Sequence, residues 1–583
     1  MQEISTAAKN AVAKPVIYQV LPRLFANTCD HCVPDGDITQ NGCGKLNDIT
    51  PRVLDSLKQL GVTHVWYTGV IEHAHATDYS AYGITPDDPH VVKGKAGSPY
   101  AISDYYDIDP DVAVSVPDRM AEFEALIKRT HDAGMQVLLD FVPNHVARRY
   151  HSDAAPAGIE DFGQGDDTTC FFTPRNNFYY IPRQLFQPSI DIGSYIEFPA
   201  KASGNDCFTA FPGPNDWYET VKLNYGVDYG DGSRHFSPVP PVWFKMLHIL
   251  RYWASKGIDG FRCDMVFMVP VEFWEWAIPQ VKERYPNLIF IAEIYDVNRY
   301  REFIERGKFD YLYDKVNLYD TLRAVQCSRH SAATITDCWQ RVDGIGSHML
   351  NFLENHDEQR FASEQYAGDA TRVLPSLVVS SMMSIGPFMI YAGQEVGEKA
   401  EDAEGFSGHD GRTTIFDYWS IPSLRRWLNG GKADGGKLAP VEKDLRALYA
   451  HILGLLNSEK AISQGEFFDL MYVNFSNPEF NPHRHYAFLR RYQDEVILVA
   501  VNFSDVAGEL AVNIPPLALG MYGIREGQRE ATELISGRKM KVNVSSATPF
   551  RTPIAPWGAV AWKFSASQLS RSAAKTARKS SKK

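Results

Sequence analysis

Short apolar segments alternate with amphipathic segments through most of the chain, and this alternation limits the fold more than any other feature. Several apolar segments are rich in Val, Ile, Leu and Phe on both faces, which is typical of parallel strands buried on both sides. Several amphipathic segments begin with Pro or follow Asp or Ser, which are common helix starts. The eight predicted strands lie at residues 16–21, 62–68, 136–141, 258–264, 288–293, 309–313, 348–354 and 387–391. Eight strand–helix units predict an α/β fold, the (β/α)8 TIM barrel.

Two stretches depart from this alternation and predict further domains. Residues 146–234 are rich in Gly, Pro and aromatic residues without helical periodicity, and they are too many for a loop. We therefore expect an irregular domain inserted after strand 3. Strand-like runs separated by turn residues predict a C-terminal antiparallel β-sandwich over 464–564. The barrel would comprise residues 1–145 and 235–463, and a basic, low-complexity tail, 565–583, would be disordered.

Charge and hydropathy narrow the class of partner. The formal net charge is −12, and an acidic surface disfavours binding to nucleic acid. No apolar run reaches the roughly 18 residues that a membrane-spanning helix needs, so no integral membrane protein is expected. Residues 1–14 lack the apolar core of a signal peptide, which predicts a cytoplasmic protein. The oligomeric state stays open.

Three of the eight cysteines, Cys29, Cys32 and Cys43, lie close together in the sequence. They fit no common zinc spacing and fall one short of a closed zinc site. Either they are free thiols, or Cys32 and Cys43 form a local disulfide in an oxidising compartment.

Polar residues end four of the predicted strands. Asp140 ends the third, Arg262 and Asp264 the fourth, Glu293 the fifth, and Asp357 follows the seventh. The carboxyl ends of barrel strands form the active-site rim. Each residue alone could be a helix cap or a loop anchor, but their coincidence on four strands favours a site. Carboxylates without a phosphate loop suit glycosidic bond cleavage, in which one carboxylate attacks the anomeric carbon and a protonated one supplies a proton to the leaving oxygen.

The spacing within the fourth strand suggests how two acids could take two roles. Side chains two residues apart on a strand share one face, so Arg262 should lie beside Asp264 and favour its ionised form. Glu293 would have to be protonated in the resting enzyme. Neighbouring anionic carboxylates would raise its pKa by repulsion between like charges.

These residues belong to motifs that resemble those of glycoside hydrolase family 13, the α-amylase family. The motifs are DFVPNH (140–145), GFRCD (260–264), IAEIYD (291–296) and ENHD (354–357), with GVTHVWYTGV (61–70) and GPFMIYAGQE (386–395) as accessory matches in order. The resemblance implies a retaining α-glucan enzyme with Asp264 as nucleophile, Glu293 as acid/base and Asp357 as the carboxylate that binds the sugar more tightly in the transition state.

The resemblance also implies roles for surrounding side chains. Arg262 would orient Asp264, and Asp140 and Asn144 would support the site. The remaining substrate contacts would be His145 and His356 to sugar hydroxyls, Tyr82 in SAYGI as a stacking platform, and Arg360 in HDEQR as a second contact on the donor side.

Two departures from the family pattern bear on metal binding and on the side of the site where the glycosyl acceptor binds. Calcium-binding members carry an Asp where VKLNYG has Lys222, and an ammonium there would replace the charge of a cation and repel Ca²⁺. We therefore expect no metal ligands and no required cofactor, although Asn144 at the other flank remains; alternatively, Lys222 is simply solvated. After the nucleophile, residues 265–268 read MVFM in place of the family's Lys-His element. An apolar acceptor side leaves open whether water or a second sugar takes the glycosyl group.

The predicted function is hydrolysis of α-1,4-glucosidic bonds in starch- or glycogen-type chains through a covalent glycosyl-aspartate intermediate, with an α-glucan as partner. A 4-α-glucanotransferase and an exo-acting α-glucosidase are alternatives within the family. A carbohydrate-binding homologue without catalysis is a remote alternative, because such proteins usually lack one of the three carboxylates that this chain retains.

Overall fold

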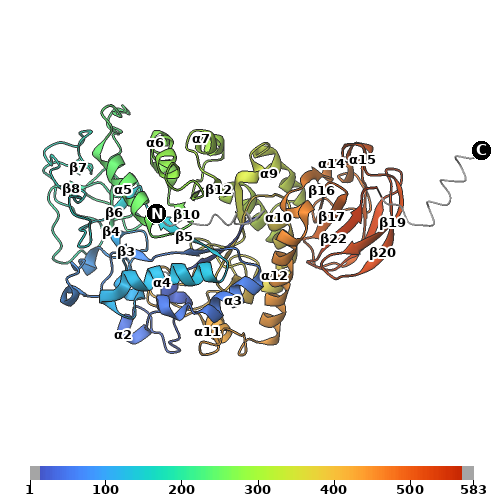
Figure 1. The fold of residues 1–583 in the computed structure, drawn as a ribbon, viewed down its shortest axis with the longest axis horizontal. Coiled ribbons are helices and arrows are strands. Elements are labelled where there is room, and N and C mark those ends of the chain that lie inside the picture. Colours follow the sequence, from blue (N-terminus) through green and yellow to red (C-terminus); the bar gives the residue numbers. More distant parts are fainter. Residues whose placement is uncertain (1–13, 407, 568–583) are drawn as a thin grey trace, which may run out of the picture.

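A computed structural model describes residues 14–406 and 408–567 of the chain (Figure 1). Its centre is a closed barrel of eight parallel strands in the order β1-β14-β13-β12-β11-β10-β5-β2. The strands are β1 (Val16–Val20), β2 (His64–Tyr67), β5 (Gln136–Phe141), β10 (Gly260–Cys263), β11 (Ile289–Ala292), β12 (Tyr311–Tyr313), β13 (Met349–Phe352) and β14 (Phe388–Tyr391). The predicted barrel fold is confirmed, and each barrel strand falls within its predicted segment.

Helices pack around the barrel, and α3 shows how an apolar stripe directs one of them. In α3 (Pro51–Leu60), Thr50 caps the first turn, Gly61 ends the helix at φ 102°, and the stripe Val53, Leu54, Leu57 and Leu60 is buried. The other helices are α1 (Pro22–Phe25), α2 (Ile38–Asn41), α4 (Arg119–Asp132), α5 (Pro241–Ser255), α6 (Val271–Lys282), α7 (Tyr300–Glu305), α8 (Asp320–Gln326), α9 (Ile335–Arg341), α10 (Leu374–Met382), α11 (Pro422–Leu428), α12 (Pro440–Ser458), α13 (Lys460–Ser463), α14 (Met471–Asn474) and α15 (Pro516–Met521).

The long connections after β2 and β5 carry short sheets at one end of the molecule (Figure 1). Strands β3 (Ile71–His73) and β4 (Ile102–Ile108) pair after β2. After β5, the chain forms β6 (His145–Ala147) with β9 (Thr220–Lys222), and β7 (Tyr180–Ile181) with β8 (Ala200–Lys201). The irregular insert expected after the third strand is therefore present.

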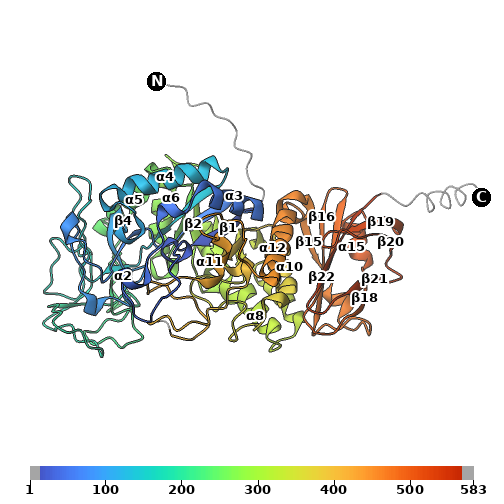
Figure 2. The same cartoon turned by 90° about the horizontal axis from the view of Figure 1, so that it is seen from below.

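The C-terminal β-sandwich lies at the opposite end of the long axis, and α12 lies between it and the barrel in both views (Figures 1 and 2). Its larger sheet has the order β15-β16-β17-β22-β19-β20, and its smaller sheet pairs β18 with β21. The strands are β15 (Glu466–Asp469), β16 (His485–Tyr492), β17 (Glu495–Asn502), β18 (Gly508–Val512), β19 (Gly527–Glu533), β20 (Lys539–Val544), β21 (Phe550–Ile554) and β22 (Ala559–Ser565). The domain boundaries drawn from the sequence stay predictions. Ser565 ends β22, so this strand enters the segment predicted as a tail, and residues 568–583 of that tail lie outside the described residues.

All eight cysteines are unpaired, Cys32 and Cys43 included. Within the described residues, the helices are all too short or too polar to cross a membrane.

Asp469 links the sandwich to the barrel. This buried carboxylate ends β15, and its Oδ2 accepts hydrogen bonds from Thr336 Oγ1 (2.7 Å) and Trp339 Nε1 (2.7 Å) on the barrel side. The same oxygen accepts a bond from Tyr486 OH of β16 at 2.8 Å. Three donors from two domains thus depend on one acceptor.

Asp469→Ala should lower the free energy of unfolding by about 3 kcal/mol, because it leaves the buried Tyr486 hydroxyl and two partly buried donors without an acceptor. Asp469→Asn keeps an acceptor oxygen and should lower it less. Urea unfolding of both variants, with the exposed Asp505→Ala as control, measures the difference. An Asp469→Ala variant as stable as the control would contradict this account of the junction.

Candidate active site

Arg262 lies at the centre of the predicted strand-end cluster. Its side chain is 1% exposed, with Nη1 2.8 Å from Asp264 Oδ1 and Nη2 2.8 Å from Glu293 Oε1. Asp140 Oδ1 is 3.7 Å from Nη1. The rings of Trp66, Tyr100 and Tyr313 surround the guanidinium at 5.2–5.4 Å from their centroids. One buried cation thus joins carboxylates from β5 and from the ends of β10 and β11.

Asp140 lies behind the cavity. Trp66 Nε1 donates to its Oδ2 at 3.0 Å, and burial raises its pKa to about 7, against the lowering effect of Arg262. The carboxylate is held by an indole and a guanidinium and does not line the cavity. This position suits the supporting role that the resemblance implies.

Glu293 is held by three donors. Besides Arg262, the backbone N–H of Met265 donates to Oε2 at 2.8 Å, and Tyr295 OH donates to Oε1 at 2.6 Å. Burial raises the pKa of Glu293 above its usual value, and the Asp264 charge raises it further. Burial also raises the pKa of Asp264, against the influence of Arg262. The arrangement can therefore hold one carboxyl group protonated beside another that carries charge.

Asp264, Glu293 and Asp357 line one cavity of about 320 Å³ at the barrel rim. Asp357 is the most open of the three, with a side chain 40% exposed, and its Oδ2 is 3.2 Å from His356 Nε2. Desolvation and the neighbouring Glu293 raise its pKa to about 7. His145 lines the same cavity, whereas His356 lies behind it. Burial lowers the pKa of both histidines to about 3, so their rings are neutral near pH 7.

Tyr82 is not part of this cavity, which corrects the predicted stacking platform. It ends a short turn in the loop between β3 and β4, is 55% exposed, and packs near Tyr79 with ring centroids 6.4 Å apart. Tyr100 from the same loop lines the cavity instead. Its ring stacks on His356 at 5.2 Å and 25°, and its hydroxyl is 2.5 Å from His356 Nε2. Tyr100 comes two residues before β4, whose sequence ISDYYDI is not an apolar run, so the sequence contains no strand-end signal for it.

Arg360 does not line the cavity either, so the predicted donor-side contact is wrong. Its side chain is fully buried, with Nη1 3.0 Å from Glu354 Oε2 and 3.0 Å from Ala392 O. The guanidinium lies 3.9 Å from the Tyr391 ring centroid. Arg360 therefore anchors the residues after β13 to the end of β14.

Lys222 occupies the centre of a set of oxygen atoms. Its side chain is 2% exposed, and Nζ is 2.6 Å from Asp206 Oδ1 and donates to Asn144 Oδ1 and to Met268 O at 3.1 Å. The alternative of a solvated lysine is therefore wrong. A carboxylate, an amide oxygen and a backbone carbonyl are ligands that Ca²⁺ favours, but the ammonium already bonds all three. The residues present do not fit a calcium ion at this place.

Two other groups of the described residues could hold a metal, His75 with Asp109 and Asp111, and Glu72 with Asp104 and Asp107. Their carboxylates already bond protein donors. Asp111 accepts bonds from Tyr79 and Tyr418, Asp104 from Ser152, and Asp107 from Arg119. Burial raises the pKa of Glu72 to about 10, so its carboxyl group is neutral near pH 7 and needs no metal ion to balance a charge.

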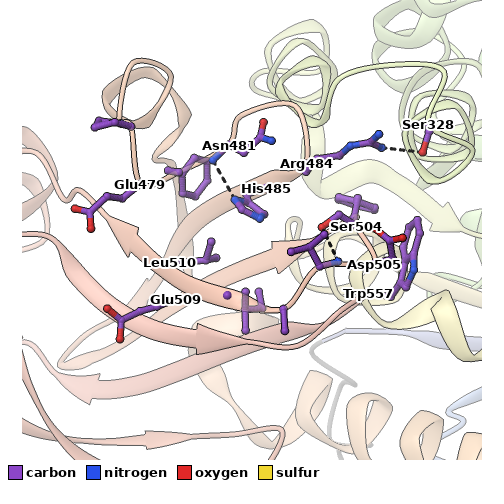
Figure 3. A pocket seen from close by; sticks show the side chains of 17 residues that line it. Ser328, Glu479, Asn481, Arg484, His485, Ser504, Asp505, Glu509, Leu510 and Trp557 are labelled. Carbon is purple, nitrogen blue, oxygen red and sulfur yellow. Dashed lines mark hydrogen bonds between the residues drawn. The ribbon is translucent and has the colours of Figure 1, made fainter.

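A larger cavity of about 900 Å³ lies beside the sandwich (Figure 3). Arg484 Nη1 donates to Ser328 Oγ at 2.7 Å across it to the barrel. Its carboxylates Glu479 and Glu509 are exposed and share Arg551. This larger cavity contains no buried carboxylate pair, whereas the rim cavity contains Asp264 and Glu293. The rim cavity is therefore the candidate active site.

The sequence matches the family model "Alpha amylase, catalytic domain" over residues 19–177 and 238–415, more than half of the chain. Alpha-amylase 3 of Dictyoglomus thermophilum is 22% identical over 551 residues, covering 91% of this chain and 92% of that protein. Alpha-amylase MalA of Haloarcula japonica is 26% identical over 388 residues, but the match spans only 44% of its length. The structure resembles the maltogenic alpha-amylase AmyB from Thermotoga neapolitana with TM-score 0.61 and 19% identity, covering 95% of this chain and 99% of that one.

Arg262→Leu should destabilise the fold more at high than at low pH. Arg262 lowers the pKa values of Asp140, Asp264, Glu293 and Asp357, so its removal raises them further above their unfolded values. The stability gained from protonation is present below the unfolded pKa and is lost as pH rises through the folded pKa.

We expect little loss at about pH 5 and a loss of about 3–5 kcal/mol at about pH 8, where buried carboxylates stay uncompensated. Urea unfolding at both pH values tests this, with the exposed Arg551→Leu as control. Equal losses at both pH values would refute the electrostatic role.

Proposed function

The chain belongs to the alpha-amylase family of glycoside hydrolases, and on this premise we propose that it is a retaining α-glucan hydrolase that cleaves α-1,4-glucosidic bonds in starch- or glycogen-type chains. The observation that carries the proposal is the single guanidinium of Arg262 between Asp264 and Glu293 on the wall of the rim cavity. A pair bridged by one guanidinium favours the separation of about 5–5.5 Å found in retaining enzymes over the roughly 6.5–9.5 Å of inverting ones.

In the first displacement, a carboxylate oxygen of Asp264 attacks the anomeric carbon while the Glu293 carboxyl group gives its proton to the leaving glycosidic oxygen. The products are a glycosyl ester of Asp264 and a shortened glucan. In the second, Glu293 takes a proton from water, whose oxygen attacks the same carbon and releases Asp264. Arg262 fixes the position of both groups, and burial keeps the pKa of Glu293 raised for its role as acid.

The remaining cavity residues suit one bound sugar ring. Tyr100 offers an aromatic face for the apolar C–H face of a sugar in the place assigned to Tyr82. His145 and Asp357 have polar atoms at the cavity for hydroxyl groups, and His356 holds both Tyr100 and Asp357 from behind.

A 4-α-glucanotransferase is the second candidate. Met265 and Tyr295, on the Glu293 side of the cavity, form a largely apolar surface that a sugar could cover. Occupation of this surface by a second glucan would exclude water from the ester and favour transfer.

We also propose that no metal cofactor is required, because Lys222 supplies the cation between barrel and insert. Its ammonium joins Asn144 after β5, Asp206 of the insert and the Met268 carbonyl after β10. A covalently attached cation keeps these loops together at any calcium concentration.

Asp264→Asn and Glu293→Gln should each abolish most turnover of maltoheptaose and soluble starch. The first removes the nucleophile, and the second removes the proton donor, which is worth about 10²–10⁴-fold. Chromatographic product assays measure this, with Asp505→Asn as the control for amide substitution. Wild-type turnover in either variant, with the fold intact, would overturn the assignment.

Lys222→Asp should create a calcium requirement that the natural protein lacks. The new carboxylate joins Asp206, Asn144 and a carbonyl in a set that Ca²⁺ prefers. Thermal melting should show that Ca²⁺ raises the Tm of Lys222→Asp above its value in chelator. The natural protein and Lys222→Met should respond little, and Lys222→Met should melt lower because it leaves Asp206 unpaired. If chelator destabilises the natural protein strongly and Ca²⁺ reverses this, the role assigned to Lys222 is wrong.

A further inference from the structure

We propose that the active site is closed on its donor side, so that the enzyme acts on the non-reducing end of short or already shortened α-glucans and not on internal bonds. The proposal rests on the function proposed above. It follows from a wall of the cavity formed by residues 93–98 after β2 and residues 415–416 after β14.

The wall lies across the barrel from the proposed proton donor. In the closed ring of eight strands, β1 is diametrically opposite β11, and β14 and β2 are the neighbours of β1. Glu293 directly follows β11. Loops that leave β14 and β2 therefore face Glu293 across the rim, and Lys93, Ser98, Ile415 and Phe416 from these loops line the cavity.

Arg23, which follows β1, forms hydrogen bonds to both the loop after β2 and the loop after β14. This side chain is 1% exposed, and its guanidinium donates to Ala96 O at 2.7 Å, Gly97 O at 3.2 Å and Ile415 O at 2.6 Å. The backbone N–H of Ala96 also donates to Phe416 O at 3.0 Å. The two loops of the wall are thus joined by a backbone hydrogen bond, and the buried guanidinium of Arg23 donates to three of their carbonyl oxygens.

Close packing continues along the wall. A Cβ on Gly94, which has φ +65°, would lie 2.2 Å from Phe416 O, so the two loops approach as closely as glycine allows. Beyond Gly94, Lys93 Nζ pairs with Glu219 Oε2 of the insert at 3.0 Å, with both side chains nearly buried. The wall therefore runs without interruption from the loop after β14 through the loop after β2 to the insert.

The direction of a bound glucan follows from the chemistry of a pyranose ring. The anomeric carbon and the 4-hydroxyl lie on opposite sides of the ring. Glu293 protonates the oxygen on the anomeric carbon, so the leaving chain extends on the Glu293 side, past Met265, Tyr295 and Lys315. The 4-hydroxyl then faces the wall. A cavity of about 320 Å³ is at the lower end of the volume range of small-molecule sites, so it holds only a short part of a glucan.

The test compares two substrates on the full chain. One is para-nitrophenyl α-maltoheptaoside, and the other is the same compound with an ethylidene acetal on its non-reducing sugar. We expect the free substrate to be shortened from its non-reducing end. The capped one should react at least about 100-fold more slowly, as expected for a bulky group forced against a packed wall. Cleavage of both at comparable rates would overturn the proposal. Cleavage of neither would instead show that the proposed hydrolase function is wrong, and the inference would fall with it.

Phe416→Ala tests the wall itself. Loss of the ring should raise the ratio of capped to free cleavage about tenfold, because it opens space beside the 4-hydroxyl. Phe475→Ala is the matched control, because Phe475 is 58% exposed in the sandwich and does not line the cavity. A ratio in Phe416→Ala equal to that of the control would also overturn the proposal. The comparison of substrates on the natural protein decides the question even where a variant fails to fold.

Discussion

One buried ion cluster, Arg262 with Asp140, Asp264 and Glu293, sets the conditions for the rest of the site. A single guanidinium does not neutralise the carboxylates around it, so the cavity carries excess negative charge or bound protons. Glycoside cleavage develops positive charge on the sugar ring, and fixed negative groups stabilise that charge where it forms. The cluster can persist without bulk water because a closed barrel brings the ends of three neighbouring strands, β5, β10 and β11, to one point, and three aromatic rings surround the cation.

Lys222 is also a buried cation surrounded by oxygen acceptors, but its role is structural. A buried ammonium costs desolvation free energy, which falls only when every neighbouring acceptor is well placed. Here a carboxylate, an amide and a carbonyl from three separate segments supply those acceptors. His145 pairs with Lys222 across β6 and β9, so the lysine also fixes the strand that carries a cavity residue. Stability of the insert and the shape of the cavity are therefore coupled through one side chain.

The parts of this arrangement that the sequence predicts are those with local signals. Barrel strands show as apolar runs. Asp264 and Glu293 follow their strands directly and Asp357 comes shortly after β13, so strand ends locate the carboxylates. Tyr82 and Tyr100 share one long loop, and only the path of that loop decides which ring reaches the cavity. Arg360 follows a strand end as Asp357 does, yet its partners Glu354 and Ala392 turn it inward. The role of Arg23 cannot be predicted from the sequence, because its acceptors are backbone carbonyls far along the chain, and any residue type can supply a backbone carbonyl.

Backbone contacts of this kind explain why the donor-side wall is a fixed feature and not a movable lid. Gly97 has φ +72°, and a Cβ there would lie 1.7 Å from Ala74 O, so this loop is held against Ala74, directly after β3, as tightly as against Phe416. A ligand can displace a flexible side chain at little cost, but moving this wall would break the carbonyl bonds of Arg23 and leave a buried guanidinium without acceptors. Arg23 follows β1, and β1 lies opposite β11, the strand that precedes Glu293. The closed ring of strands that brings the carboxylates together therefore also sets the free-energy cost of admitting a longer donor chain.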